Sequence, residues 1–208
     1  MAGIGLYGVY YSKATVTDGV LASYNGVKTM GKAISASFEA AEGSDERLWA
    51  NNTVAETDAG ASAGGTLTLT LDKLTNDAYV DLFGLTSKTE SVTVGGDSVT
   101  GTGYDSTGAE AANAVGVAFI RWRQESNVRT FYEAVIYSYV TFNEPSEEFA
   151  TYNGVDGVAW QTPELEGAVS GGIVTGALPW RKRYTFPSQA AAVQFITDYF
   201  AAPQSDNT

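Results

Sequence analysis

Carboxylates are the residues of this sequence whose types and spacing come nearest to a catalytic pattern. Two carboxyl groups held about 5–9 Å apart can serve a glycosidase as acid and as nucleophile or base. Three pairs are candidates by their closeness in sequence: Asp45–Glu46, Glu147–Glu148 and Glu164/Glu166. The first two pairs lie in polar, turn-like stretches, and the third would project from one face of a strand. Acids in such places are mostly solvated, so we expect no catalytic residue.

The residue types that are missing narrow the chemistry further. The 208-residue chain contains no histidine and no cysteine. Histidine is the usual proton carrier near neutral pH and the commonest metal ligand, and cysteine supplies thiolates and disulfides. Ser-His-Asp and Cys-His catalysis are therefore excluded, and a zinc site is not expected. We accordingly predict a protein that is not an enzyme and carries no cofactor.

The glycine-rich stretch 95–113, in the middle of the chain, contains two further candidate binding motifs. Asp97, Asp105 and Glu110 are potential calcium ligands, but their spacing matches no calcium loop. The segment 101–103 reads Gly-Thr-Gly, as in some phosphate-binding loops, but no lysine follows it and no strand-to-helix transition is expected there. We therefore predict neither a metal site nor a phosphate site in this stretch.

The charge balance is strongly acidic, with 24 Asp and Glu against 12 Lys and Arg and a net charge of −12. Binding nucleic acid over an extended surface is disfavoured, because phosphate contacts need clustered basic side chains. Acidity also favours solubility, and it suits a conduit through which DNA passes without adsorbing. Half of the basic residues follow residue 120: Arg121, Arg123, Arg129, Arg181, Lys182 and Arg183. We expect them to pair with acidic loops within one subunit or between subunits.

Size and apolar content indicate one folded domain spanning residues 1–208. The hydrophobic fraction of 44% is enough to build a core. No run of about 18 apolar residues occurs, and the first eleven residues lack a basic start followed by a long apolar segment. We therefore predict neither a membrane span nor a signal peptide, and synthesis in a cytoplasm.

Alternation of apolar and polar residues with a period of two predicts a mainly β fold. In 66–71 leucine and threonine alternate without exception, and 34–40 places Ile34 and Phe38 on one face and Ser35 and Glu39 on the other. Further strands are expected at 115–123, 129–142 and 180–186, with weaker signals at 5–11, 92–99 and 164–174.

The aromatic segment 131–142 is the most informative of the expected strands. Strict alternation would put Tyr132, Ala134, Ile136, Ser138, Val140 and Phe142 on one face, and Phe131, Glu133, Val135, Tyr137, Tyr139 and Thr141 on the other. Both faces are largely apolar. The strand is either buried on both sides within its own domain, or the face with Tyr137 and Tyr139 meets a neighbouring subunit.

Two segments show helical rather than strand periodicity. Residues 75–85 begin with Thr75 as a helix cap and carry an apolar stripe, and residues 188–200 begin with Ser188 and carry a second stripe. Two long polar loops are expected at 42–65 and 95–113, and loops of that length in a compact domain are often functional. The tail 201–208 is expected to fray.

Taken in order, these features resemble the major tail proteins of long-tailed phages that infect Gram-positive bacteria, the phi13-like family. The resemblance rests on the strand 34–40, the acidic segment Glu-Arg-Leu-Trp-Ala-Asn-Asn at 46–52 with Glu56 beyond it, and Gly-Thr-Leu-Thr-Leu-Thr-Leu-Asp at 65–72. It continues through Leu-Phe-Gly at 82–84, Val-Gly-Val-Ala-Phe at 115–119, the aromatic strand, Pro-Ser-Glu-Glu at 145–148 and Trp-Gln-Thr-Pro at 160–163. Members of the family often carry Asp where this chain has Asn51 and Asn52.

This resemblance implies a β-sandwich or half-barrel of two packed sheets with a short flanking α-helix, a long polar loop and a C-terminal helix. Six copies would close a ring, and stacked rings would form a tube in the virion, made in the host's cytoplasm. A tape measure protein would lie inside and terminator or distal tail proteins at the ends, while DNA passes without specific binding. Candidate contacts between rings or subunits are Leu48, Trp49, Asn51, Asn52, Glu56, Arg121, Arg123, Tyr137 and Tyr139.

Two alternatives stay open at this point. The four tryptophans and twelve tyrosines also suit a carbohydrate-binding β-sandwich module. A tail terminator or a secretion-tube protein would share the fold of a tail tube protein. Leu48 and Trp49 are either anchors for ring stacking or side chains that fold back on their own domain.

Overall fold

The structure, a computed structural model, describes residues 2–41, 46–50, 53–58, 64–125, 129–147, 161–171 and 179–202. Nine strands in these ranges form one antiparallel sheet: β1 (Ala2–Thr17), β2 (Val20–Tyr24), β3 (Lys28–Gly31), β4 (Ala33–Ala40), β7 (Gly64–Leu71), β10 (Ala114–Glu125), β11 (Arg129–Phe142), β12 (Glu164–Ser170) and β13 (Arg181–Phe186). Two further pairs stand apart as hairpins: β5 (Glu46–Ala50) with β6 (Thr53–Asp58), and β8 (Thr86–Val94) with β9 (Asp97–Asp105). The helices are α1 (Asn76–Phe83) and α2 (Gln189–Ala201).

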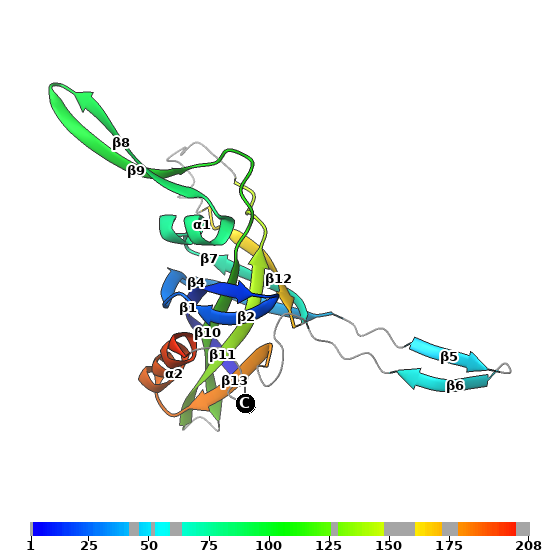
Figure 1. Cartoon of the computed structure of the whole chain (residues 1–208). Coiled ribbons are helices and arrows are strands. Elements are labelled where there is room, and N and C mark those ends of the chain that lie inside the picture. Colours follow the sequence, from blue (N-terminus) through cyan, green and yellow to red (C-terminus); the bar gives the residue numbers. More distant parts are fainter. Residues whose placement is uncertain are drawn as a thin grey trace, which may run out of the picture.

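The large sheet curls round a core (Figure 1). Its order is β2-β1-β10-β11-β12-β7-β4, with β13 paired to β11 and β3 paired to β1. Only Lys32 separates β3 from β4, and β3 bonds to β1 while β4 bonds to β7. The two ends of the sheet are thereby brought together. The expected mainly β class is confirmed, but the expectation of two packed sheets is wrong, because one curved sheet supplies both walls of the core.

The inner core follows from the alternation seen in the sequence. Leu67, Leu69 and Leu71 of β7 are fully buried, while the threonines between them are not. Partners from β1, β10, β11 and β12 complete the cluster, among them Val9, Tyr11, Val117, Val135, Phe142 and Leu165. Burying one such leucine or phenylalanine contributes about 1.5–3 kcal/mol, so the inner face of the sheet dominates the stability of the fold.

Helix α1 packs against this inner core. The Thr75 side chain accepts a hydrogen bond from the Ala78 backbone N–H, and Gly84 ends the helix in the left-handed region at φ 69°. Ala78 and Leu82 are fully buried. The helix predicted at 75–85 is therefore confirmed, with its cap and its apolar stripe.

Helix α2 covers the outer face of β10 and β11. The Ser188 side chain accepts from the Ala191 backbone N–H and caps the helix. A second core forms beneath the helix from Ala118, Ile120, Ala134, Ile136, Ala192, Ile196, Tyr199 and Phe200. The helix predicted at 188–200 is confirmed. Of the tail, residues 203–208 lie outside the described residues.

Both stretches expected to be long loops contain hairpins instead. Within 42–65 the strands β5 and β6 pair with each other, and within 95–113 the strand β9 pairs along its whole length with β8. The signal was obscured because Ser and Thr make up five of the nine residues of β8, and Ser, Thr and Gly make up five of the nine residues of β9. Such composition resembles a loop. Strands β2 and β3 were not predicted, because each is too short to show a clear alternation.

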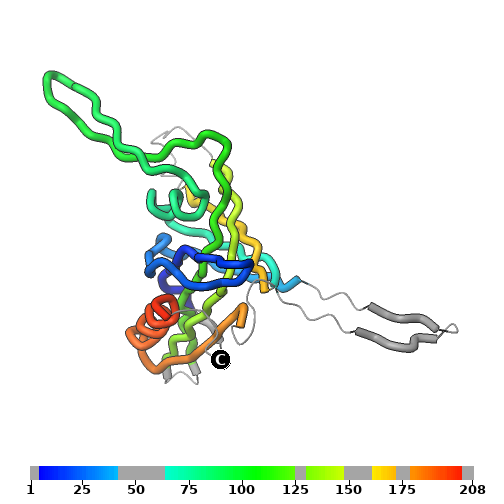
Figure 2. Tube along the Cα trace, viewed as in Figure 1, coloured from blue at the N-terminus to red at the C-terminus, as the bar shows by residue number. Residues whose placement is uncertain are grey.

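The β8–β9 hairpin extends away from the body as an arm (Figures 1 and 2). Gly95 and Gly96 form its turn with φ angles of 63° and 99°, a region that glycine adopts without strain. Every side chain of β8 is exposed, and in β9 only Gly103 and Tyr104 are half-buried. Tyr104 stacks on Tyr79 of α1 with ring centroids 5.0 Å apart and ties the base of the arm to the body. Neither helix is long and apolar enough to span a membrane, as far as the chain is described.

Candidate functional site

Strands β10, β11 and β13 bring four arginines to one end of the inner face. Directly paired residues on neighbouring antiparallel strands share a face of the sheet. The inward rows are Arg121–Glu133–Thr185, Phe119–Val135–Arg183 and Val117–Tyr137–Arg181, and Arg123 follows Arg121 by two positions. The apolar rows of the core thus give way to charged rows toward this end.

Glu133 holds the first two of these arginines. Its side chain is 7% exposed and accepts from Arg121 at 2.6 Å and from Arg123 at 3.0 Å. The Nε of Arg123 is buried without a hydrogen-bond partner. One buried carboxylate therefore serves two guanidinium groups, and the cluster keeps excess positive charge. The expected partners were acidic loops, whereas Glu133 lies within strand β11 of the same subunit. The contacts of Arg121 and Arg123 with another subunit stay predictions.

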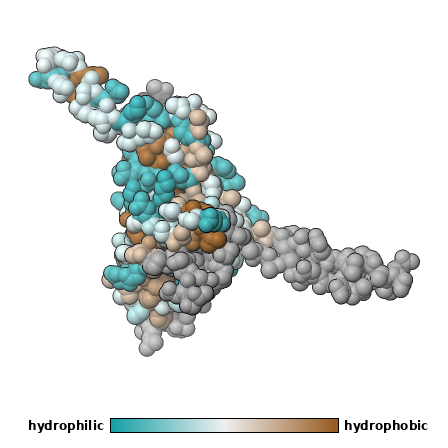
Figure 3. Space-filling view, in the orientation of Figure 1, coloured by the Kyte–Doolittle hydropathy of each residue, from teal (hydrophilic) through white to brown (hydrophobic). Residues whose placement is uncertain are grey.

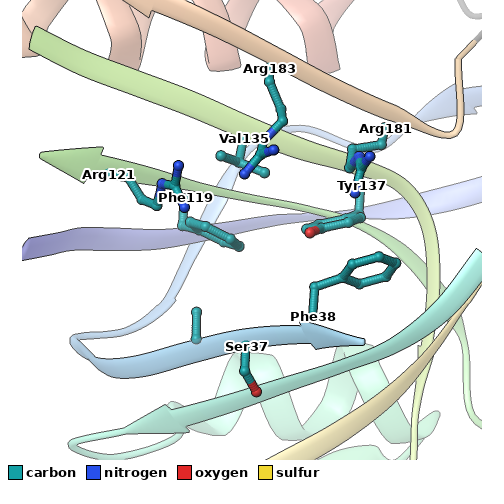
Figure 4. Close-up of a pocket in the computed structure, with 9 residues that line it drawn as sticks. Ser37, Phe38, Phe119, Arg121, Val135, Tyr137, Arg181 and Arg183 are labelled. Carbon is teal, nitrogen blue, oxygen red and sulfur yellow. The ribbon is translucent and has the colours of Figure 1, made fainter. Parts of the chain in front are cut away.

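Beside this cluster lies a pocket with a cavity volume of about 280 Å³, which we call the arginine pocket. Figure 4 shows the head groups of Arg121, Arg181 and Arg183 along one side of it. Apolar and aromatic residues form the rest of the wall: Ala36, Phe38, Phe119, Val135 and Tyr137, with Ser37 beside them. The pocket is therefore cationic on one side and apolar on the other.

Arg181 is fixed by aromatic rings. Its guanidinium carbon lies 4.7 Å from the Trp180 ring centroid and 5.5 Å from that of Phe38. Cations over ring faces are attracted by the ring quadrupole, and stacking leaves the edge of the guanidinium able to donate hydrogen bonds. One donor of Arg181 is directed at the Tyr137 side chain, and the others remain for a ligand. Within the described ranges, neither Arg181 nor Arg183 forms an ion pair. Their pre-oriented donors suit an incoming oxyanion.

Tyr137 forms part of the apolar wall and is 3% exposed. Burial raises the pKa of its hydroxyl, and the nearby positive charges of Arg181 and Arg183 offset part of that rise. Its ring lies 5.0 Å from that of Phe38. Tyr137 therefore packs within the inner core of its own subunit and borders the pocket, and its contact with a neighbouring subunit stays a prediction.

A register shift explains why strict alternation misassigned part of β11. Val115 pairs with Val140, but Val117 pairs with Tyr137, so β11 has one more residue than β10 between these pairs. Such a bulge turns the following residues to the opposite face. Val140 and Phe142 accordingly join Tyr137 in the inner core, against the predicted division of faces. Tyr139 lies within the bulge and is half-buried.

The other candidate contacts lie on the β5–β6 hairpin. Leu48 pairs with Glu56, and Trp49 pairs with Val54, along its backbone ladder. Their side chains are outside the described residues, as are Asn51 and Asn52 entirely. The proposed contacts of Leu48, Trp49 and Glu56 therefore stay predictions.

The carboxylates weighed for chemistry are dispersed. Glu164 and Glu166 are exposed on β12, and Glu147 accepts a hydrogen bond from Tyr79. Glu110 accepts from the backbone N–H groups of Thr107 and Gly108, and these bonds lower its pKa to about 2. Among the described residues, no three acids are grouped as metal ligands would be. Asp45 and Glu148 lie outside the described ranges.

Sequence reasoning selected Arg121 and Arg123 but overlooked Glu133, Arg181 and Arg183 as members of the same site. The alternation placed Glu133 on the same face as Val135 and Tyr137, but the pairing of β13 with β11 joins residues about 50 positions apart and leaves no local signal. Comparison with known proteins found no matching family model and no matching curated protein.

Proposed function

We propose that this protein is a structural subunit of a phage tail tube, which assembles into stacked hexameric rings and forms a conduit for genome DNA. The proposal rests on the resemblance in sequence to major tail proteins and on one structural observation, the exposed β8–β9 arm. Within this proposal the protein acts by self-assembly and carries out no catalysis.

The arm supports self-assembly because the monomer does not use it. A two-stranded hairpin is marginally stable in water unless another surface covers it. The side chains of β8 are all exposed, and Val92, Val94 and Val99 near the tip are 60%, 63% and 53% exposed. Exposed apolar side chains grouped on one element are typical of surfaces that bind protein. A partner is therefore expected to complete the arm.

The acidity of the chain supports a passage for DNA. A net charge of −12 on each subunit would repel phosphates and oppose adsorption of DNA to the tube wall. Local positive strips are what allow like-charged copies to associate, and the arginine pocket is one such strip.

Electron microscopy of the concentrated, purified protein tests the proposal. We expect sixfold rings or tubes, and we expect antibodies against the protein to label the tails of its phage. A chain that stays monomeric at every concentration and is absent from tails would refute the proposal. Saturable binding of the monomer on a glycan array would favour a carbohydrate-binding module instead.

A further inference from the structure

The β8–β9 arm has two chemically different faces. Paired residues share a face, so the register assigns Lys88, Glu90, Val92, Val94, Asp97 and Val99 to one side, which we call the valine face. The other side, the hydroxyl face, carries Ser and Thr at almost every position, and Ser91 and Thr100 bond across it at 3.1 Å. Figure 3 shows hydrophobic atoms near the end of the arm.

The tip of the valine face combines apolar and acidic groups. Val92 pairs with Val99, Val94 pairs with Asp97, and Glu90 comes two residues before Val92 on the same face. Within the described part of the chain, neither Glu90 nor Asp97 forms an ion pair, whereas Lys88 is paired with Asp105 at 3.2 Å nearer the body. The tip therefore offers carboxylates beside a small apolar surface.

The arginine pocket has the complementary composition. Arg181 and Arg183 supply donors without a bound carboxylate in the described ranges, and Phe38 and Phe119 supply an apolar wall. A cavity of about 280 Å³ is larger than a small inorganic ion needs, and it can admit a carboxylate together with the apolar groups beside it. An acidic segment flanked by valines matches it in charge and in polarity.

We propose that the tip of the valine face of one copy docks into the arginine pocket of a second copy. The contact is intermolecular because the arm extends away from the body, far from β13 (Figure 1). It joins two different surfaces, so it is head-to-tail and generates a closed ring or an open filament. The inference rests on the proposed function in taking another copy of this chain as the partner.

Cysteine cross-linking provides a direct test because the chain has no cysteine of its own. The test protein carries Val94→Cys at the tip, which keeps the carboxylates of Glu90 and Asp97, and Ala36→Cys in the pocket wall. Under mild oxidation we expect a ladder of disulfide-linked oligomers on a non-reducing gel. The matched control pairs Ala36→Cys with Thr93→Cys. Thr93 is next to Val94 in the chain but lies on the hydroxyl face, which points away from the pocket in the proposed contact, so the control should give at least about tenfold less disulfide-linked oligomer.

Charge exchange provides a second, independent readout. Arg183→Glu should weaken self-association about tenfold or more in sedimentation, since it places like charges opposite each other. Arg183 is exposed and outside the Glu133 ion pairs, so the variant should keep its thermal unfolding midpoint. Adding Asp97→Lys to the same chain should restore association, because the lysine at the tip of one copy then meets the glutamate in the pocket of the next copy.

The outcomes separate this contact from the proposed function. Rings or tubes that form without the Val94→Cys ladder, or with equal ladders for both cysteine pairs, overturn the contact and leave the tube function standing. A specific ladder with rescue by charge exchange, in a protein that forms no ring or tube, supports the contact and removes the tube function. No ladder and no assembly overturn both.

Discussion

Glu133 is the acidic residue that forms both ion pairs of the arginine cluster. It is almost fully buried and forms ion pairs with both Arg121 and Arg123, while Arg181 and Arg183 lie on the neighbouring rows. A buried carboxylate is tolerated where cations and hydrogen bonds compensate for its lost hydration. Removing the carboxylate leaves two cations facing each other in a confined space.

Glu133→Gln should therefore lower the free energy of unfolding by about 2–3 kcal/mol, less than for a fully buried pair because both arginines keep some contact with water. Urea unfolding of the monomer measures the change. Glu164→Gln, on the exposed face of β12, is the matched control and should change it by less than about 0.5 kcal/mol. Equal effects of the two variants would contradict the burial argument.

Among the elements whose side chains are described, strand β8 differs from the rest because every one of its side chains is exposed. Helix α1 buries Ala78, Leu82 and Phe83, and α2 buries an entire face, whereas β8 buries no side chain. Burial of apolar surface is the main source of stability, so the fold and the arm should be energetically separable. An arm that adds little stability is retained for another purpose, which we infer is association.

Replacing residues 88–103 with an Asn-Gly turn should shorten the arm without unfolding the body. Ser87 and Tyr104 pair directly and can be joined by such a two-residue turn, and Tyr104 keeps its stack on Tyr79. We expect the free energy of unfolding to change by less than about 1 kcal/mol and rings or tubes to disappear from electron micrographs. Gly95→Asn keeps the full hairpin and its turn geometry, and it should still assemble. Tubes formed by the shortened protein would show that the arm is dispensable.

The whole molecule is a curled sheet with two separately paired hairpins. The sheet runs round the core through β1, β10, β11, β12, β7 and β4. The short strand β3, which leads into β4, then pairs with β1 and closes the circuit. This closure protects strand edges that would otherwise be exposed to uncontrolled pairing. Under the proposed function, the β8–β9 arm and the end of the sheet with the arginine pocket are candidate surfaces for assembly.

On the β5–β6 hairpin, Trp49→Ala should impair tube polymerisation while leaving the monomer folded. A tryptophan anchor in an interface typically contributes 2 kcal/mol or more, which is about thirtyfold in affinity. Tube length in electron micrographs reports assembly, and thermal unfolding of the monomer reports folding. Thr53→Ala, on the same hairpin, is the control and should give normal tubes. Unchanged tube length for Trp49→Ala, with a less stable monomer, would assign Trp49 to its own domain.

The sequence by itself determined the features that depend on neighbours along the chain. Alternation identified the β7 leucines, and the caps Thr75 and Ser188 located both helices. It also excluded histidine and cysteine chemistry outright. These features are local because side-chain periodicity and capping act over a few residues.

Only the tertiary structure decided which distant residues meet. The bulge opposite Val117 placed Tyr137 in the core, and the register of β13 on β11 set Arg181 and Arg183 beside Arg121. Register is fixed by pairing with another strand, and one residue of slip reverses every face, so a single strand's pattern cannot reveal it. For the same reason the β8–β9 hairpin, which is rich in Ser and Thr, resembled a loop until the pairing of its two strands was known.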